Sequence, residues 1–177
     1  MKRISFLSIA IIALLLCAFT FITSVKWQPK EGAYSVKFSA DNASGIISGL
    51  KGSIDFDKNN AAQSKFDVSV DVNSLNTGNG LKNKHAKDAV FFDVAHYPEI
   101  HFTSTKIAKS ASGFVATGNL SIKNVTKSIS IPFTFVDKGS EAVFNGSFQI
   151  NRKEFNLNRD GVGDVIKIDM SVPVTKK

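Results

Sequence analysis

Residues 65–72 read Lys-Phe-Asp-Val-Ser-Val-Asp-Val, an unbroken alternation of polar and apolar side chains. Successive side chains of a β-strand point to opposite faces, so this stretch predicts a strand with one apolar and one polar face. Such strands are typical of antiparallel sheets that enclose a single interior, whereas strands covered by helices on both faces are apolar throughout. We therefore expect a fold built from antiparallel β-structure.

Seven other segments repeat this two-residue period. They are residues 34–40, 53–57, 100–105, 114–122, 128–135, 144–150 and 166–172. Turn-forming residues, such as those at 57–60, 137–140 and 158–163, separate several of them. Pro132 lies inside one segment, and because proline cannot donate to a ladder we expect that strand to be an edge strand or to be bulged there.

Residues 81–89 break the alternation and predict a short helix. Leu81, His85 and Ala89 recur at helical spacing, and Asn79 stands where a helix cap is needed. We expect one or two helical turns packed over an end of the β-structure.

Eight amphipathic antiparallel strands can close into a barrel, and closure removes the exposed strand edges. The sequence thus predicts an all-β fold, an eight-stranded antiparallel β-barrel with a short helix between two strands. A barrel of this size is either filled by its own side chains or holds one small ligand. A two-layer β-sandwich remains the alternative, because its sequence pattern is nearly the same.

The first 24 residues differ in character from the rest. A basic start at residues 1–3 is followed by an uncharged apolar run, and the next charge is Lys26. The run is longer than the ~7–15 apolar residues of an ordinary signal peptide and close to the ~18–20 that span a bilayer. Three interpretations stay open: a signal peptide cleaved near Ser24, a retained membrane anchor, or lipidation at Cys17. Each places the following domain, residues 30–175, outside the cytoplasm, in the periplasm or in the medium.

Composition and charge exclude several classes of function. The chain has 22 Lys and Arg against 15 Asp and Glu, a formal net charge of +7. The lysines are scattered, and without a basic block or an arginine cluster we expect no nucleic-acid partner, only weak attraction to anionic lipid surfaces. The single cysteine excludes an intramolecular disulfide. The sequence contains no nucleophile elbow, P-loop, dinucleotide fingerprint or zinc-protease motif, so we expect no catalytic residues.

Two patterns resemble metal sites only weakly. His96, Glu99 and His101 surround a turn, where polar side chains exposed to water need no metal. Residues 55–66 begin like a calcium loop, but they lack the glycine at the sixth position and the glutamate at the twelfth. We expect no bound metal.

The phenylalanines raise the question of a ligand cavity. The chain has 15 Phe but one Trp and two Tyr, and most Phe fall on the predicted inward faces. Inward aromatic residues usually form a core. The same faces, however, also carry small residues that leave room, namely Ala40, Ser104, Ala116, Gly118 and Gly146. Two hypotheses stay open: a hollow barrel for a lipophilic ligand, and a filled barrel whose loops bind protein or glycan.

Four segments resemble motifs of a known family. HAKDAVFFDV at 85–94 is similar to His-Leu-x-Ser-x-Asp-Phe-Phe-Asp, and YPEIHFTST at 97–105 to Tyr-Pro-x-Ile-x-Phe-x-Ser-Thr. GNLSIKNVTK at 118–127 is similar to Gly-x-Leu-Thr-Ile-x-Gly-Val-Thr-Lys, and NRKEF at 151–155 to Asn/Asp-Arg-x-Asp/Glu-Phe. With further likeness at 49–57 and 70–77, the chain resembles the YceI-like, polyisoprenoid-binding family from about residue 34 to residue 174.

The resemblance implies a lipocalin-like antiparallel barrel in a periplasmic or secreted protein. It also implies a long polyisoprenoid or similar amphiphile in the central cavity. The chain departs from the family pattern at four positions, with Tyr34 for His, Ala86 for Leu, Val90 for Asp and Asn124 for Gly.

Together these observations predict a non-enzymatic protein that binds a polyisoprenoid or an isoprenoid quinone-like amphiphile for transport or storage. We expect no cofactor other than the lipid. Contact with a membrane surface and a homodimer are further predictions. The expected cavity-lining residues are Phe38, Phe66, Val68, Phe91, Phe92, Phe102, Phe133, Phe135, Phe144, Phe148, Ile168 and Met170. His85, Asp93 and Arg152 are the polar candidates near the cavity mouth, where Arg152 either pairs with a carboxylate such as Asp93 or meets the polar end of the ligand.

Overall fold

The computed structural model describes residues 25–177; the segment 1–24, expected to be a signal peptide or anchor, lies outside the described residues. Between residues 25 and 177 the chain forms nine β-strands, one α-helix and two short 3-10 helices. The strands are β1 Lys26–Pro29, β2 Ser35–Ala40, β3 Ala43–Asp55, β4 Lys65–Asn76, β5 Glu99–Ser110, β6 Gly113–Ile122, β7 Val125–Asp137, β8 Glu141–Asn151 and β9 Val165–Lys176. The helices are η1 Ala61–Gln63, α1 Gly80–Lys87 and η2 Arg152–Phe155.

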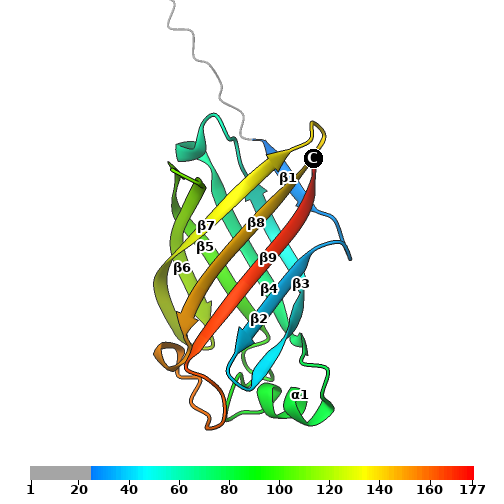
Figure 1. Cartoon of the computed structure of the whole chain (residues 1–177), viewed down its shortest axis with the longest axis vertical. Coiled ribbons are helices and arrows are strands. Elements are labelled where there is room, and N and C mark those ends of the chain that lie inside the picture. Colours follow the sequence, from blue (N-terminus) through cyan, green and yellow to red (C-terminus); the bar gives the residue numbers. More distant parts are fainter. Residues whose placement is uncertain (1–24) are drawn as a thin grey trace, which may run out of the picture.

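The strands form one closed antiparallel barrel (Figure 1). Eight strands follow one another in the order β3-β2-β9-β8-β7-β6-β5-β4, and β4 pairs back with β3. The short β1 lies beyond the end of β2 and pairs with the same two neighbours, β3 and β9. The predicted eight-stranded barrel is confirmed and the sandwich is excluded, while β1 extends the barrel N-terminal to the expected start at residue 30.

Strand β3 is longer than the sequence pattern indicated. The prediction covered residues 53–57, but the strand begins at Ala43. Its register against β4 shifts twice, between Ile46 and Lys51. Gly49 has a φ of +71°, and a Cβ there would lie 2.6 Å from the Cβ of Asp71. Irregular pairing and close backbone approach require glycine in this strand, and glycine hides the alternation.

Pro132 does not lie on an edge strand. Strand β7 pairs with both β6 and β8, and its register against β6 is continuous. The ladder to β8 begins at Phe133, one residue after the proline. The expectation of an edge or a bulge was therefore wrong: β7 is internal, and Pro132 lies where β7 separates from β8.

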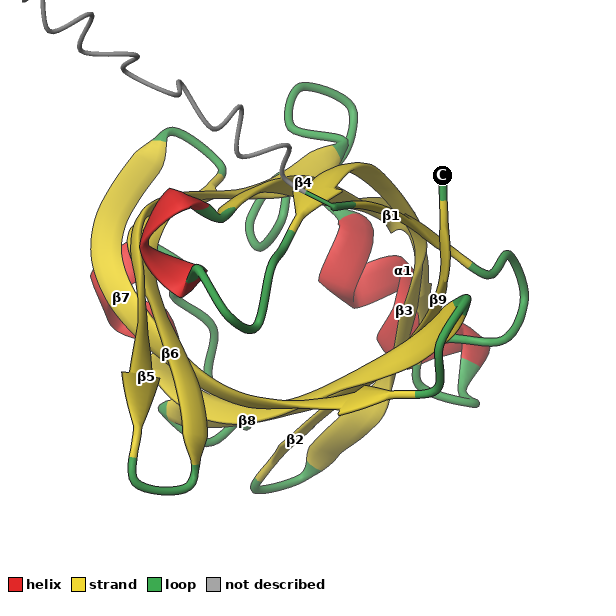
Figure 2. Cartoon of the chain, turned by 90° about the horizontal axis from the view of Figure 1, so that it is seen from above, coloured by secondary structure: helices red, strands yellow, loops and turns green. Residues whose placement is uncertain are grey.

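The two ends of the barrel are covered differently (Figure 2). The connection from β3 to β4, which contains η1, crosses one end. Helix α1 and the connection from η2 to β9 lie at the other. The predicted helix is confirmed with its cap, since the Asn79 side chain accepts hydrogen bonds from the backbone N–H groups of Leu81 and Lys82. None of the helices described here has the length and apolar character to cross a bilayer.

Candidate functional site

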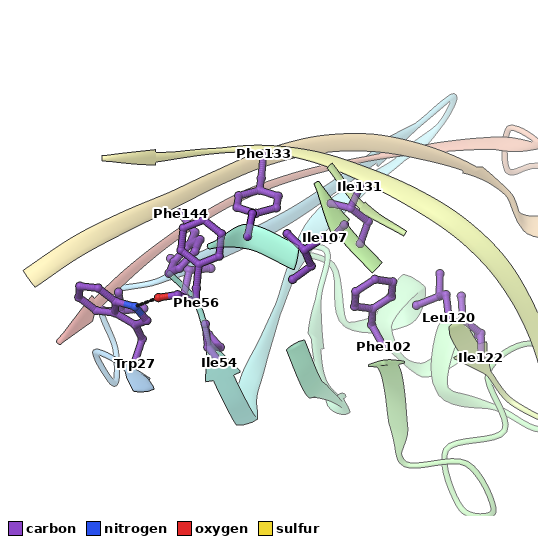
Figure 3. Packing of buried hydrophobic residues seen from close by; sticks show 14 of the residues in the cluster. Trp27, Ile54, Phe56, Phe102, Ile107, Leu120, Ile122, Ile131, Phe133 and Phe144 are labelled. Atoms are coloured by element: carbon purple, nitrogen blue, oxygen red, sulfur yellow. Dashed lines mark hydrogen bonds between the residues drawn. The ribbon is translucent and has the colours of Figure 1, made fainter. Parts of the chain in front are cut away.

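A packed set of aromatic rings fills the end of the barrel that carries η1. Phe56, on the connection after β3, is 1% exposed. Its ring centroid lies 4.9–6.1 Å from those of five other phenylalanines. The indole N–H of Trp27 donates to the Phe56 carbonyl at 2.9 Å (Figure 3). We call this set the aromatic plug: Trp27, Phe56, Phe66, Phe114, Phe133, Phe135 and Phe144.

A cavity of about 420 Å³ occupies the rest of the barrel and opens towards α1. Its wall consists almost entirely of apolar side chains from β2 to β9, and the rings of Phe66, Phe133 and Phe144 belong both to the plug and to this wall. The volume lies within the ~300–1,000 Å³ of small-molecule sites. The barrel is therefore not filled by its own side chains, which contradicts the filled-barrel hypothesis.

Most residues expected at the cavity are found in its wall. They are Phe38, Phe66, Val68, Phe91, Phe92, Phe102, Phe133, Phe144, Phe148, Ile168 and Met170. Phe135 is the exception and a correction, because its ring packs 5.3 Å from Trp27 and 4.9 Å from Phe56, inside the plug. Alternation tells which face of a strand a residue occupies but not its height along the barrel axis.

Sequence reasoning missed part of the wall. Aliphatic residues on the same inward faces complete it, among them Val36, Ile47, Leu50, Leu75, Ile100, Leu120, Ile122, Ile131, Ile150, Ile166 and Val172. Many of these residues belong to the alternating segments, so the two-residue period already places their side chains on the inward faces. Lys82, Arg159 and Asp160 also line the mouth, but they lie on α1 and a connection, where no two-residue period marks a side chain as inward.

Only some of the small inward residues leave room for a ligand. Ala116 and Gly146 line the cavity, whereas Ala40, Ser104 and Gly118 do not. A Cβ on Gly118 would lie 2.3 Å from a backbone oxygen of the neighbouring strand β5. Gly118 therefore permits close strand approach and creates no space.

Arg152 is a buried structural anchor for the connection at the open end. Its side chain is 3% exposed. The guanidinium donates to the carbonyls of Leu157, Val162 at 2.8 Å and Gly163 at 3.0 Å, and pairs with a carboxylate oxygen of Asp164 at 3.0 Å. The predicted ion pair with a carboxylate is present, but its partner is Asp164 and not Asp93. Arg152 instead fixes residues 156–164 in place, and this connection forms one side of the cavity mouth.

Asp93 also departs from the expectation. It has a φ of +51° and its carboxylate lies 2.9 Å from Nδ1 of His96, and it is not part of the cavity lining. His85 does line the cavity, as expected. The charged and titratable side chains of residues 25–177 that line the cavity are thus those of Lys82, His85, Arg152, Arg159 and Asp160, which include the predicted His85 and Arg152 but not Asp93.

Two long cations tie the elements of the mouth together. The Arg159 guanidinium donates to the His85 carbonyl at 3.2 Å and to the Asp88 carboxylate at 3.4 Å, so it joins the 156–164 connection to the α1 region. Lys82 of α1 donates to the Asn42 carbonyl at 3.0 Å, which joins the helix to the β2–β3 turn. Both contacts are partly exposed and hold the mouth more weakly than Arg152 does.

The residues singled out as weak metal candidates have separate partners. His101 Nε2 lies 2.7 Å from the Asp67 carboxylate, and His96 faces Asp93. Glu99 pairs with Lys51, and this hydrogen bond lowers the pKa of the Glu99 carboxyl below its ordinary value. Over residues 25–177, no three His, Cys, Asp or Glu side chains come together in a way that could hold a metal ion.

A closed antiparallel barrel with one packed end and one apolar cavity has the architecture of barrels that enclose a small molecule. Residues 27–174 match the YceI-like domain, and the chain belongs to this family. It is 33% identical over 122 residues to a UPF0312 protein of Enterobacter sp. (strain 638), covering 66% of this chain and 64% of that one. It is 30% identical over 143 residues to protein YceI of Salmonella newport (strain SL254), covering 74% of this chain and 75% of that one. The chain therefore spans just under two thirds of the Enterobacter relative.

Solved structures share the barrel. BcnA of Burkholderia cenocepacia superimposes with a TM-score of 0.79 at 24% identity, over 84% of this chain and 100% of that chain. The YceI protein of Campylobacter jejuni gives 0.69 at 28% identity, over 77% and 86%. A polyisoprenoid binding domain of Saccharophagus degradans gives 0.64 at 13% identity, over 88% and 99%.

Proposed function

We propose that the protein binds one polyisoprenoid or isoprenoid quinone-like amphiphile in its barrel and carries or stores it outside the cytoplasm. The observation that carries the proposal is the apolar cavity of about 420 Å³, closed by the plug at one end and open at the other. The family and the fold shared with a polyisoprenoid binding domain support the ligand class.

The geometry favours entry of the ligand tail first. The plug blocks the far end, so a polar head group remains at the mouth beside Lys82, His85 and Arg159. Burial of the tail is favourable by about 25 cal/mol for each Å² of apolar surface removed from water. Affinity then depends mainly on the tail, and the head group contributes orientation.

A binding role without chemistry agrees with the position of the titratable groups. Those that line the cavity in the described chain are Lys82, His85, Arg152, Arg159 and Asp160, which lie on α1 or on the connection after β8. A general acid or base acting on a buried tail would need to lie deep in the apolar wall.

Phe148→Asp tests the proposal. Phe148 is half-buried and lines the cavity outside the plug, so a carboxylate there opposes an apolar guest without removing a plug ring. Uptake of a fluorescent isoprenoid analogue should become undetectable in a protein that remains folded. Gln149→Asp, one residue along β8 on the exposed face, is the matched control and should bind normally. Saturable uptake by folded Phe148→Asp would contradict the proposal.

Mass spectrometry of organic extracts from the purified protein identifies the ligand. The proposal predicts an isoprenoid lipid in the wild type and its loss in Phe148→Asp. Phe133→Asp is a poorer test, because Phe133 belongs to the plug and we expect that variant to unfold.

We also propose a periplasmic or secreted location, supported by the character of residues 1–24. The lipid must come from a membrane or return to one, so contact with a membrane surface is part of the proposed function. Cell fractionation and the mass of the mature protein test the location and the fate of this segment. The homodimer stays a prediction.

A further inference from the structure

Exposed apolar side chains gather around the open end of the barrel. In the described part of the chain, five large hydrophobic side chains are strongly exposed. Leu81 and Val90, which are 63% and 67% exposed, flank α1 at its two ends. Val165 begins β9 beside the 156–164 connection, and Ile46 lies on β3 opposite Asn76, just before α1. Of these five side chains, only that of Val136 lies at the other end, so the exposed hydrophobic side chains are concentrated around the cavity mouth.

The helix between the two most exposed residues is positively charged. Helix α1 contains Lys82, Lys84 and Lys87 and no carboxylate, and none of its residues is buried. None of these lysines pairs with a carboxylate among residues 25–177. Lys82 and Lys87 donate to the backbone carbonyls of Asn42 and Asn73, which leaves their positive charge uncompensated, so the charge of α1 acts on an external anionic surface.

Several acidic groups of the same end are paired within the chain. Asp88 faces Arg159, Asp93 faces His96, and Asp164 is held by Arg152 and Lys153. The exposed side chains of Asp41, Glu154 and Asp160 have no such partner among the described residues and oppose an anionic surface. None of the three lies on α1, whose lysines are close to the two most exposed apolar side chains.

We infer that the open end docks on the surface of an anionic lipid bilayer, with α1 against the head groups and Leu81 and Val90 inserted beneath them. Basic side chains that flank inserted apolar residues are the chemistry of interfacial membrane binding. The mouth then faces the lipid phase, so an apolar tail passes between bilayer and barrel without crossing water. This inference rests on the proposed lipid-binding function and adds the face that performs the exchange.

The opposite end also carries exposed lysines, among them Lys109 and Lys138, but Val136 is its only strongly exposed large hydrophobic side chain among residues 25–177. The chain enters the barrel there, where the Val25 carbonyl accepts a hydrogen bond from Phe56 N–H at 2.9 Å. Residue 25 therefore lies at the packed end, away from the mouth, and the proposed docking face consists of described residues of α1 and the mouth.

Vesicle sedimentation with residues 25–177 tests the inference. The match to BcnA covers 84% of this chain and all of the BcnA chain. A chain that consists of the barrel alone therefore adopts this fold, which supports the use of residues 25–177. We expect binding to vesicles of phosphatidylcholine mixed with phosphatidylglycerol, weakening as salt is added, and little binding to phosphatidylcholine alone. Binding should fall at least ~10-fold when Lys84 and Lys87, the lysines of α1 that do not line the cavity, are both changed to Gln.

The matched charge control replaces Lys109 and Lys138 by Gln at the other end and should keep binding within about twofold. Leu81→Ser with Val90→Ser should weaken binding about fivefold, whereas Val136→Ser should not.

Uptake of the fluorescent isoprenoid analogue from detergent micelles separates the two proposals. Normal uptake without vesicle binding, or equal loss in both lysine variants, overturns docking and leaves lipid binding intact. Absence of uptake in the wild-type domain overturns the proposed function itself. Normal uptake with charge-dependent vesicle binding that is lost only in the α1 variants supports docking.

Discussion

The two ends of the barrel are built from the same alternating strands, yet one is solid and the other is hollow. At the plug, a connection inserts Phe56 between rings from β4, β6, β7 and β8. At the mouth, the connections after β4 and β8 contribute cations that bind backbone carbonyls of the rim. The strands therefore define the wall, whereas the residue types in the connections decide which end remains open.

The largest effect is expected from Phe56→Ala, which removes the centre of the plug. A fully buried ring in contact with five others leaves a cavity that the rigid strands cannot close. We expect a loss of about 3–5 kcal/mol in the free energy of unfolding, measured by chemical denaturation. Val136→Ala, at the same end but 46% exposed, should stay within about 0.5 kcal/mol of the wild type. A Phe56→Ala loss as small as that of the control would show that the plug is not a rigid core.

The wall could be predicted from sequence because alternation is a local signal. Phe66, Val68 and Phe148 reveal their face through their immediate neighbours, and the barrel follows from eight such strands. The plug could not be predicted: the alternation at 53–57 places Phe56 on an apolar face, but the strand ends at Asp55 and the partners of Phe56 are brought together only by closure of the barrel. Lys82 and Arg159 could not be assigned to the mouth for the same reason, since their neighbours there come from distant parts of the chain. The partner predicted for Arg152 was wrong because Arg152 binds mainly backbone carbonyls, which no side-chain pattern indicates.

Arg152→Met should produce the next largest effect, at the opposite end. The substitution keeps apolar volume but leaves the carbonyls of Leu157 and Val162 without their buried donor. Because hydrogen bonds to charged groups contribute about 1.5–3 kcal/mol each, we expect a loss of that order. Hydrogen exchange should rise in residues 156–164 while the plug stays protected. Lys153→Met, which removes only the exposed partner of Asp164, is the control and should change exchange little.

Equal exchange increases at both ends in Arg152→Met would contradict the independence of plug and mouth. Such a result would mean that the 156–164 connection supports the whole barrel and not the rim alone.

A smaller effect is expected from Arg159→Gln, which weakens the bridge between the 156–164 connection and α1. Partly exposed ion pairs contribute about 0.2–1 kcal/mol, so release of a bound fluorescent isoprenoid should accelerate about 1.5- to 5-fold. Stability should hardly change, because the bridge joins two rim elements and no buried group is exposed. Lys127→Gln, on the exposed surface of β7, should release the probe at the wild-type rate. Unchanged release in Arg159→Gln would show that the bridge does not limit ligand exit.

The smallest expected effect is a change in the hydrogen exchange of residues 156–164 when the Asp164 carboxylate is protonated in acid. A hydrogen bond from Lys153, supported by the charge of Arg152, holds the pKa of Asp164 below its ordinary value of 3.8. A lowered folded-state pKa means that this carboxylate stabilises the fold at pH values above 3.8 and that the contribution is lost as the pH falls through the lower value. Hydrogen exchange of residues 156–164 should therefore be insensitive to pH near neutrality, once corrected for intrinsic exchange, and should rise only in strong acid.

Asp164→Asn separates this local titration from general acid denaturation. The variant should show at neutral pH the loosened 156–164 connection that the wild type shows in acid, and it should lose most of the pH dependence there. Asp169→Asn is the matched control, because the pKa of Asp169 is also lowered, by Ser147 and Lys167, but its side chain makes no contact with this connection. The plug contains no titratable side chain, so its protection should follow global stability alone. If Asp169→Asn loosened the 156–164 connection as much as Asp164→Asn, the effect would belong to the charge of the whole barrel, and the two ends would not be independent.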